Sequence, residues 1–226
     1  MKNMLKTASA VKSMGQQKGY TLVELSVAVA IAGVLLMGSI QLVQTVLNTS
    51  RANDTISSLA RTITQIDKVW SSLDTYADLS IANASAAGAF PDMTTRGSGA
   101  TATVINKFNM PVQLDLIKNL PTAGSDRGFA LVHTGIPRSV CADIVTAGVA
   151  AGFKGIVIIP ENTAGVQASS LTGLTMNTSG GIDNVPTTAA LALDPSSPSL
   201  NIGKMTGATG CGASKNSVSI GFVTWK

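Results

Sequence analysis

An uncharged apolar segment dominates the first part of the chain. Leu25 to Ser50 contains no charged residue. As an α-helix at about 1.5 Å per residue, this segment reaches roughly 39 Å, more than the ~30 Å of bilayer hydrocarbon. Gln41, Gln44 and Asn48 weaken the pattern toward its end. We therefore predict a membrane helix whose most apolar part is Leu25 to Ile40.

A second helical pattern follows without a break. Beyond Arg51, apolar residues recur at every third or fourth position, which is the spacing of one helix face. These residues are Ile56, Leu59, Ile63, Ile66, Trp70 and Leu73. Because no proline occurs before Pro91, a single helix from about Tyr20 to Tyr76 is allowed. The pattern predicts a helical spine whose first half is apolar all round and whose second half packs under a sheet.

The second half of the chain has apolar runs typical of strands, separated by segments rich in small and polar residues. The predicted elements are a loop region at 80–103, a short strand or helix within 108–120, a strand at 128–134, a turn at 135–137, a helix capped by Ser139 and ended by Gly152, a strand at 155–159, mostly loop with short strands at 161–214, and a closing strand at 217–225. Together with the spine, these elements predict an α+β fold.

The positive charge of the chain is confined to its beginning. The formal net charge is +4, from 16 basic and 12 acidic residues. Lys2, Lys6, Lys12 and Lys18 precede Gly19 and no acidic residue accompanies them, so the rest of the chain is formally neutral. This location argues against nucleic acid as a partner. Basic residues before a membrane helix instead predict a cytoplasmic leader and a C-terminal domain that faces the periplasm or the outside.

The sequence offers little support for an enzyme. His133 is the only histidine, which excludes a multi-histidine metal site. We interpret it as a packed or edge residue of a strand. Neither G-x-S-x-G nor H-E-x-x-H occurs. We therefore expect no catalytic residue, no metal and no cofactor.

The two cysteines, Cys141 and Cys211, both lie in the domain that is predicted to be outside the cytoplasm. They are too far apart for a CxxC redox motif, and two thiols alone make a poor metal site. A disulfide closing a loop of about 70 residues would stabilise the domain by roughly 4 kcal/mol in the chain-entropy model. We expect this disulfide, with two free thiols as the alternative.

The junction before the apolar helix differs from an ordinary signal-peptide site. A signal peptide is cut on the far side of its apolar core, after small residues. Here the small residue, Gly19, lies on the near side and follows the basic leader. Cleavage after Gly19 would keep the apolar helix on the mature protein. Glu24 is then an acid beneath the membrane surface, which costs several kcal/mol unless it is paired or protonated.

The run Lys18-Gly-Tyr-Thr-Leu-Val-Glu-Leu25 resembles the prepilin-peptidase site of type IV pilins and pseudopilins. The resemblance implies cleavage between Gly19 and Tyr20, N-methylation of Tyr20, and Glu24 as the fifth mature residue. It also implies that Glu24 pairs with the free amine of Tyr20 in a neighbouring subunit during filament assembly. The alternative is a simple signal-anchor whose Glu24 sits among lipid headgroups.

The later pattern is similar to the type IVb branch, which includes toxin-coregulated, bundle-forming and thin conjugative pilins. A strand leads into a helix with the first cysteine, the second cysteine precedes the final strand, and the leader is long. The resemblance implies a leader at 1–19, a hydrophobic transmembrane and assembly helix at 20–50, and a globular pilin domain at 51–226. The pilin-like fold would pack the spine on an antiparallel β-sheet, with a C-terminal region bounded by Cys141 and Cys211.

The implied function is that of a major pilin. The chain would be held in the inner membrane, processed by prepilin peptidase, and assembled by inner-membrane machinery into a helical homo-oligomeric filament. That filament would be an extracellular pilus for adhesion or conjugation. A minor pilin or a type II secretion pseudopilin is the first alternative, and a membrane-anchored adhesin or binding domain is the second. We expect partner specificity in the loop from Glu161 to Ser214, because surface loops commonly carry it.

Overall fold

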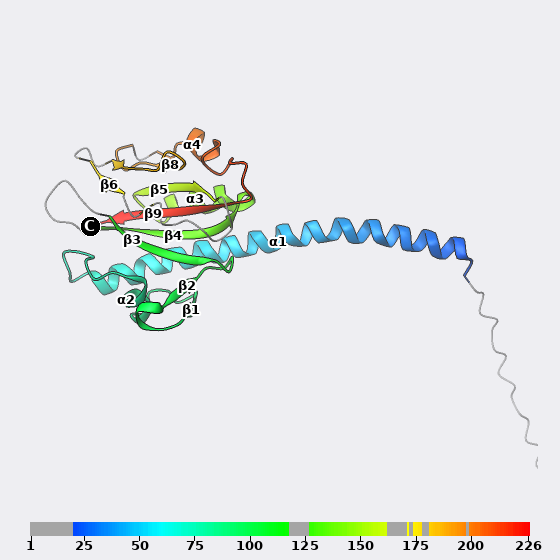
Figure 1. Cartoon of the computed structure of the whole chain (residues 1–226), viewed down its shortest axis with the longest axis horizontal. Coiled ribbons are helices and arrows are strands. Elements are labelled where there is room, and N and C mark those ends of the chain that lie inside the picture. The colour runs from blue at the N-terminus through cyan, green and yellow to red at the C-terminus, as the bar shows by residue number, and fades with distance from the viewer. Residues whose placement is uncertain (1–19, 118–126, 162–170, 172–173, 178–180, 198) are drawn as a thin grey trace, which may run out of the picture. The chain divides into compact units, whose positions relative to one another are not determined.

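The computed structural model describes residues 20–117, 127–161, 171, 174–177, 181–197 and 199–226 (Figure 1). The chain forms two compact units, which divide between Val43 and Gln44. The predicted leader, including Gly19, lies outside the described residues.

The predicted spine is a single helix, α1 (Leu22–Trp70). It ends at Trp70 and not at Tyr76, and the ammonium of Lys226 donates hydrogen bonds to the carbonyls of Trp70 and Leu73 just beyond this end. A lysine at the C-terminus of a helix satisfies free carbonyls and complements the helix dipole. Leu73 therefore lies outside the helix, where 47% of it is exposed.

The buried face of α1 is rotated from the predicted one. Its buried residues are Ala52, Thr55, Ser58, Leu59, Thr62, Ile66 and Trp70. Ile56 and Ile63 are only partly buried at the border of this face. Thr55 can be buried because its hydroxyl donates to the Arg51 carbonyl oxygen at 2.8 Å, so the helix itself satisfies the polar group.

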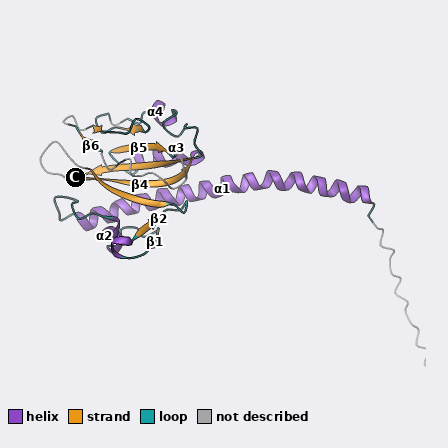
Figure 2. Ribbon diagram, viewed as in Figure 1, coloured by secondary structure: helices purple, strands orange, loops and turns teal. Residues whose placement is uncertain are grey.

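A seven-stranded antiparallel sheet packs on this face of α1, in the order β1-β2-β3-β4-β9-β5-β8 (Figure 2). The strands are β1 (Thr94–Arg96), β2 (Thr103–Ile105), β3 (Pro111–Ile117), β4 (Gly128–Pro137), β5 (Gly155–Pro160), β8 (Ala190–Leu193) and β9 (Ser217–Trp225). A separate two-stranded pair consists of β6 (Thr175–Met176) and β7 (Ile182–Asp183). The α+β fold predicted from the sequence is thus confirmed.

The central strands β4, β9 and β5 are buried on both faces, which explains their nearly continuous apolar sequence. On one face, residues of α1 and of α3 (Arg138–Ala150) share a core with Phe129, Ile156 and Phe222. The other face is covered by residues from the segment between β5 and β8, namely Leu171, Leu174, Met176 and Ile182. Part of the predicted 161–214 loop therefore forms a second core.

The predicted turn at 135–137 and the predicted cap at Ser139 are both wrong. β4 continues through Pro137, with a bulge between His133 and Ile136, and α3 begins directly at Arg138 with Pro137 as its N-cap. Gly135 adopts a φ of 69° in this bulge, and its N–H donates to Glu161 Oε1 at 2.8 Å. The buried carboxylate satisfies the bulged N–H, so the strand can bend without ending.

Short elements lie in segments that were predicted as loop. Residues 80–103 contain α2 (Ile81–Ala86), β1, the 3₁₀ helix η1 (Gly99–Thr101) and the start of β2. Likewise, α4 (Ile202–Thr206) lies within 161–214. These elements are too short to show a hydrophobic period. Side-chain caps start both α-helices: Ser80 Oγ accepts from Asn83 N at 3.2 Å, and Asn201 Oδ1 accepts from Lys204 N at 2.9 Å.

Candidate assembly site and disulfide

Thr21 caps the N-terminus of α1. Its hydroxyl oxygen accepts a hydrogen bond from Glu24 N at 3.2 Å, and its carbonyl oxygen accepts one from Leu25 N at 3.1 Å. This is the threonine half of a capping box, whose spacing is T-x-x-E. Thr21 was not among the predicted site residues, although Thr21-Leu-Val-Glu24 has this capping-box spacing. The cap fixes where the helix begins relative to Tyr20.

Glu24 consequently lies in the first turn of α1. A carboxylate there is favoured by the free N–H groups of the helix N-terminus. Tyr20 precedes the cap and is 81% exposed. The structure places both predicted site residues at the N-terminal end of α1. Glu24 is the first charged residue of this helix, and the next is Arg51. Cleavage, methylation and intersubunit pairing stay predictions.

The helix surface after Glu24 is apolar and exposed. The exposed large apolar residues of this surface are Leu25, Val27, Val29, Ile31, Val34, Leu35, Leu36, Met37, Ile40, Leu42, Val43, Val46 and Leu47. Ser26 and Ser39 donate their hydroxyl hydrogens to the carbonyl oxygens of Val23 and Leu36, at 2.7 and 2.9 Å. These hydroxyls therefore need no water, which suits apolar surroundings. By length and composition, α1 is long enough and apolar enough to cross a membrane.

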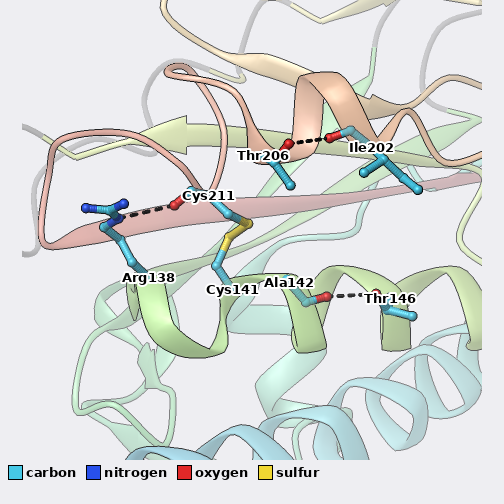
Figure 3. The surroundings of a disulfide bond; sticks show 7 residues. All are labelled: Arg138, Cys141, Ala142, Thr146, Ile202, Thr206 and Cys211. Atoms are coloured by element: carbon cyan, nitrogen blue, oxygen red, sulfur yellow. Dashed lines mark hydrogen bonds between the residues drawn. A yellow bond between two sulfur atoms is a disulfide. The ribbon is translucent and has the colours of Figure 1, made fainter.

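The predicted disulfide between Cys141 and Cys211 is present, with Cα atoms 5.7 Å apart (Figure 3). It joins α3 to the segment before β9. Cys211 also donates its N–H to the Met205 carbonyl oxygen at 2.7 Å, and its own carbonyl oxygen accepts from Arg138 Nε at 3.2 Å. The bridge thus anchors α4 and the following turn on the N-terminal half of α3.

His133 is fully buried in β4. Its ring lies edge-on to Phe222, with centroids 6.0 Å apart, and neither ring nitrogen has a hydrogen-bond partner in the described part of the chain. Burial lowers the pKa of His133 to about 4. A neutral histidine in this environment is a core residue and not a base. Among the described residues, no three His, Cys, Asp or Glu side chains are placed to hold a metal ion.

Two family models match the chain. The one described as PilS N terminal matches residues 49–190, and the one described as prokaryotic N-terminal methylation motif matches residues 14–40. The first covers more than half of the chain. The second spans the Gly19-Tyr20 junction and the first part of α1.

Solved pilin structures also match the chain. One is TcpA, a type IV pilin from Vibrio cholerae El Tor biotype, with 16% identity, a TM-score of 0.48, and coverage of 77% of this chain and 99% of that one. Another is the type IVb pilin from Salmonella typhi, with 18% identity, a TM-score of 0.43, and coverage of 74% and 96%. No curated protein sequence matches the chain significantly.

Proposed function

Because the chain belongs to the PilS family and is a type IV pilin, we propose that it is the major structural subunit of a type IVb pilus. Prepilin peptidase removes residues 1–19 by cutting after Gly19, and the new amino group on Tyr20 is methylated. Before assembly, the subunit is held in the inner membrane by α1, with its C-terminal domain in the periplasm. Assembly machinery then moves it into an extracellular helical filament for adhesion or conjugation. The chain is a building block and not an enzyme.

The observation that carries this proposal is the surface of α1 between Glu24 and Arg51. It is exposed, uncharged and rich in large apolar side chains. Removing such a surface from water is favourable by about 25 cal/mol for each Å² buried. The bilayer covers this surface before assembly, and the equivalent helices of neighbouring subunits cover it in the filament.

Glu24 supplies the specificity that apolar contacts lack. Apolar surfaces attract one another at many relative heights because the attraction is non-directional. A carboxylate transferred into apolar surroundings is stabilised only at the height where it meets a cation. The Tyr20 amine of a neighbouring subunit is such a cation, and it exists only after cleavage. The pair therefore sets the axial register of the filament.

The test is intact-mass and N-terminal analysis of protein sheared from cell surfaces. The expected species begins at methylated Tyr20, lacks two hydrogen atoms because of the Cys141–Cys211 disulfide, and is abundant in filaments. A cleaved but scarce species would instead identify a minor pilin or pseudopilin. A chain that still begins at Met1 and occurs only in membranes would overturn the proposal in favour of an anchored adhesin or binding domain.

A further inference from the structure

A cavity of about 510 Å³ is lined by residues of β8, of α4 and of the segment that connects them. This part of the chain belongs to the region bounded by the two cysteines. Its lining residues are Leu191, Asp194, Ser197, Ser199, Leu200, Asn201, Ile202 and Lys204. The volume falls in the range of about 300–1,000 Å³ that is usual for small-ligand sites. Figure 3 shows α4, which carries Ile202, beside the disulfide.

The backbone around this cavity is held by hydrogen bonds of its own. Ser196 N and Ser197 N donate to Asp194 Oδ1 and Asp194 O, at 3.1 and 2.9 Å. Asn201 N donates to the Ala192 carbonyl oxygen of β8 at 2.8 Å, and Asn201 Oδ1 caps α4. The described residues 194–197 and 201 are thus held in place by contacts within the loop and to β8 and α4, which lowers the ordering cost of binding a ligand.

Several polar groups of the lining are not used by the fold. Within the described part of the chain, the hydroxyls of Ser197 and Ser199, the amide nitrogen of Asn201 and the ammonium of Lys204 have no hydrogen-bond partner in the protein. Both serines can donate and accept, whereas the amide nitrogen and the ammonium donate. These groups can serve a ligand without breaking a bond that the fold needs.

The charge and the apolar residues of the lining restrict the chemical class of the ligand further. Asp194 and Lys204 are its charged residues and have opposite signs, so the lining is formally neutral. Leu191 and Leu200 are half-buried, and Ile202 is 64% exposed, which is unusual for an isoleucine of the C-terminal unit. Neutral charge, free donors and acceptors, and an aliphatic wall match a molecule with many hydroxyls and one C–H face.

We infer that this cavity binds a neutral, hydroxyl-rich carbohydrate unit. The hydroxyls of such a unit exchange hydrogen bonds with Ser197, Ser199 and Asn201, and its C–H face packs on Ile202. This binding goes beyond the proposed structural role, because a single subunit contains the whole cavity and no filament is needed.

The test is saturation-transfer NMR on the full-length protein in a zwitterionic detergent that has no sugar headgroup. The probes are the methyl glycosides of glucose, galactose, mannose, N-acetylglucosamine and N-acetylgalactosamine, with methyl glucuronide as the acidic probe. At least one neutral glycoside is expected to receive saturation. Each lost hydrogen bond weakens binding about fivefold, so the Ser197→Ala/Ser199→Ala variant is expected to bind at least tenfold more weakly.

Ser214→Ala is the matched control, because Ser214 is exposed outside the cavity. If the double variant does not fold, Lys204→Gln is compared with Lys215→Gln, since both lysines are exposed. Lys204→Gln is then expected to weaken binding severalfold and Lys215→Gln to leave it unchanged. Saturation of none of the neutral glycosides, saturation of methyl glucuronide alone, or native affinity in the cavity variants would overturn the inference. Glu24→Val distinguishes glycoside binding from filament assembly: this variant is expected to form no filaments but to bind the glycoside with native affinity.

Discussion

At the scale of single residues, three glycines make room for larger side chains. A Cβ atom on Gly148 of α3 would overlap the Phe222 ring of β9. A Cβ on Gly155 of β5 or on Gly221 of β9 would overlap the Cδ1 atom of Ile182 or of Leu171, respectively. The first glycine lets α3 approach the sheet closely. The other two let the segment between β5 and β8 insert its side chains into the opposite face.

Gly148→Ala is expected to destabilise the protein by about 1–3 kcal/mol, because overpacking forces neighbours off their preferred positions. Phe222 has little freedom to yield, since its ring also packs on Phe153 at a centroid distance of 4.9 Å. Urea unfolding of the full chain measures the loss. Gly203→Ala in α4 is the control: its nearest neighbour, Asn201 Oδ1, would be 3.5 Å away, and we expect a change within about 0.5 kcal/mol. Equal stability of the two variants would contradict this account.

Asp115 of β3 and His133 of β4 should change the free energy of unfolding in opposite directions as the pH falls. Burial raises the pKa of Asp115 to about 6, above its ordinary 3.8, and lowers that of His133 to about 4, below its ordinary 6.5. As the pH falls from about 6 to 4, the folded state binds a proton at Asp115 before the unfolded chain does, which stabilises the fold. Over the same window the unfolded chain binds a proton at His133 and the folded state does not, which destabilises it. The two effects oppose each other.

Removing one of these groups should expose the effect of the other. In Asp115→Asn, we expect the free energy of unfolding to fall by roughly 3 kcal/mol between pH 6.5 and pH 4, as His133 alone would cause. In His133→Phe, it should rise as the pH falls through 6. Urea unfolding at a series of pH values measures both slopes. The exposed Asp74→Asn is the control and should keep the native profile. If the free energy of unfolding depended on pH in the same way in all three variants, the claim that the two groups have opposite effects would be refuted.

At the scale of elements, long periodic segments could be predicted and short ones could not. The spine and the strands β4, β5 and β9 follow from apolar runs that extend over many residues. The end of α1 was misplaced because Lys226, distant in sequence, meets the carbonyls of Trp70 and Leu73. The bulge of β4 was mistaken for a turn because the acceptor of the Gly135 N–H, Glu161, comes from another strand end. Both errors arise from tertiary contacts.

The disulfide is the element-scale constraint with the largest expected effect. It bridges a sequence separation of 70 residues, and for such a loop the chain-entropy model gives about 4 kcal/mol of stabilisation. Cys141→Ser/Cys211→Ser is therefore expected to lower the free energy of unfolding by that amount. Urea unfolding with and without a reductant checks it: reductant should lower the native midpoint and leave the variant unchanged. If complete reduction of the disulfide left the urea midpoint of the native protein unchanged, the bridge would add no stability.

At the scale of the whole molecule, the resemblance to type IV pilins was readable because it rests on contiguous residues. Lys18 to Leu25 lie within the matched methylation motif, and the PilS model matches residues 49–190. The cavity between β8 and α4 could not be predicted in the same way. Its polar residues have no recognisable spacing, and Leu191 joins them only when α4 folds back beside β8. The region for which we predict partner specificity, 161–214, contains this cavity, but the sequence singled out none of the lining residues, and the specificity stays a prediction.

The proposed filament assembly depends on one side chain more than on any other, that of Glu24. Glu24→Val is expected to abolish filaments, because the variant keeps the apolar attraction between helices but loses the proposed charge pair that would select one register. The fold of the unit from Gln44 to Lys226 should be unaffected, since Glu24 is an exposed residue at the start of α1. Electron microscopy and the yield of sheared protein measure assembly. N-terminal analysis of the membrane fraction verifies that the variant is still cut after Gly19, and Glu24→Asp, which retains a carboxylate, should recover part of the filament yield. Normal filaments from Glu24→Val would eliminate the charge pair and leave apolar packing alone to set the register.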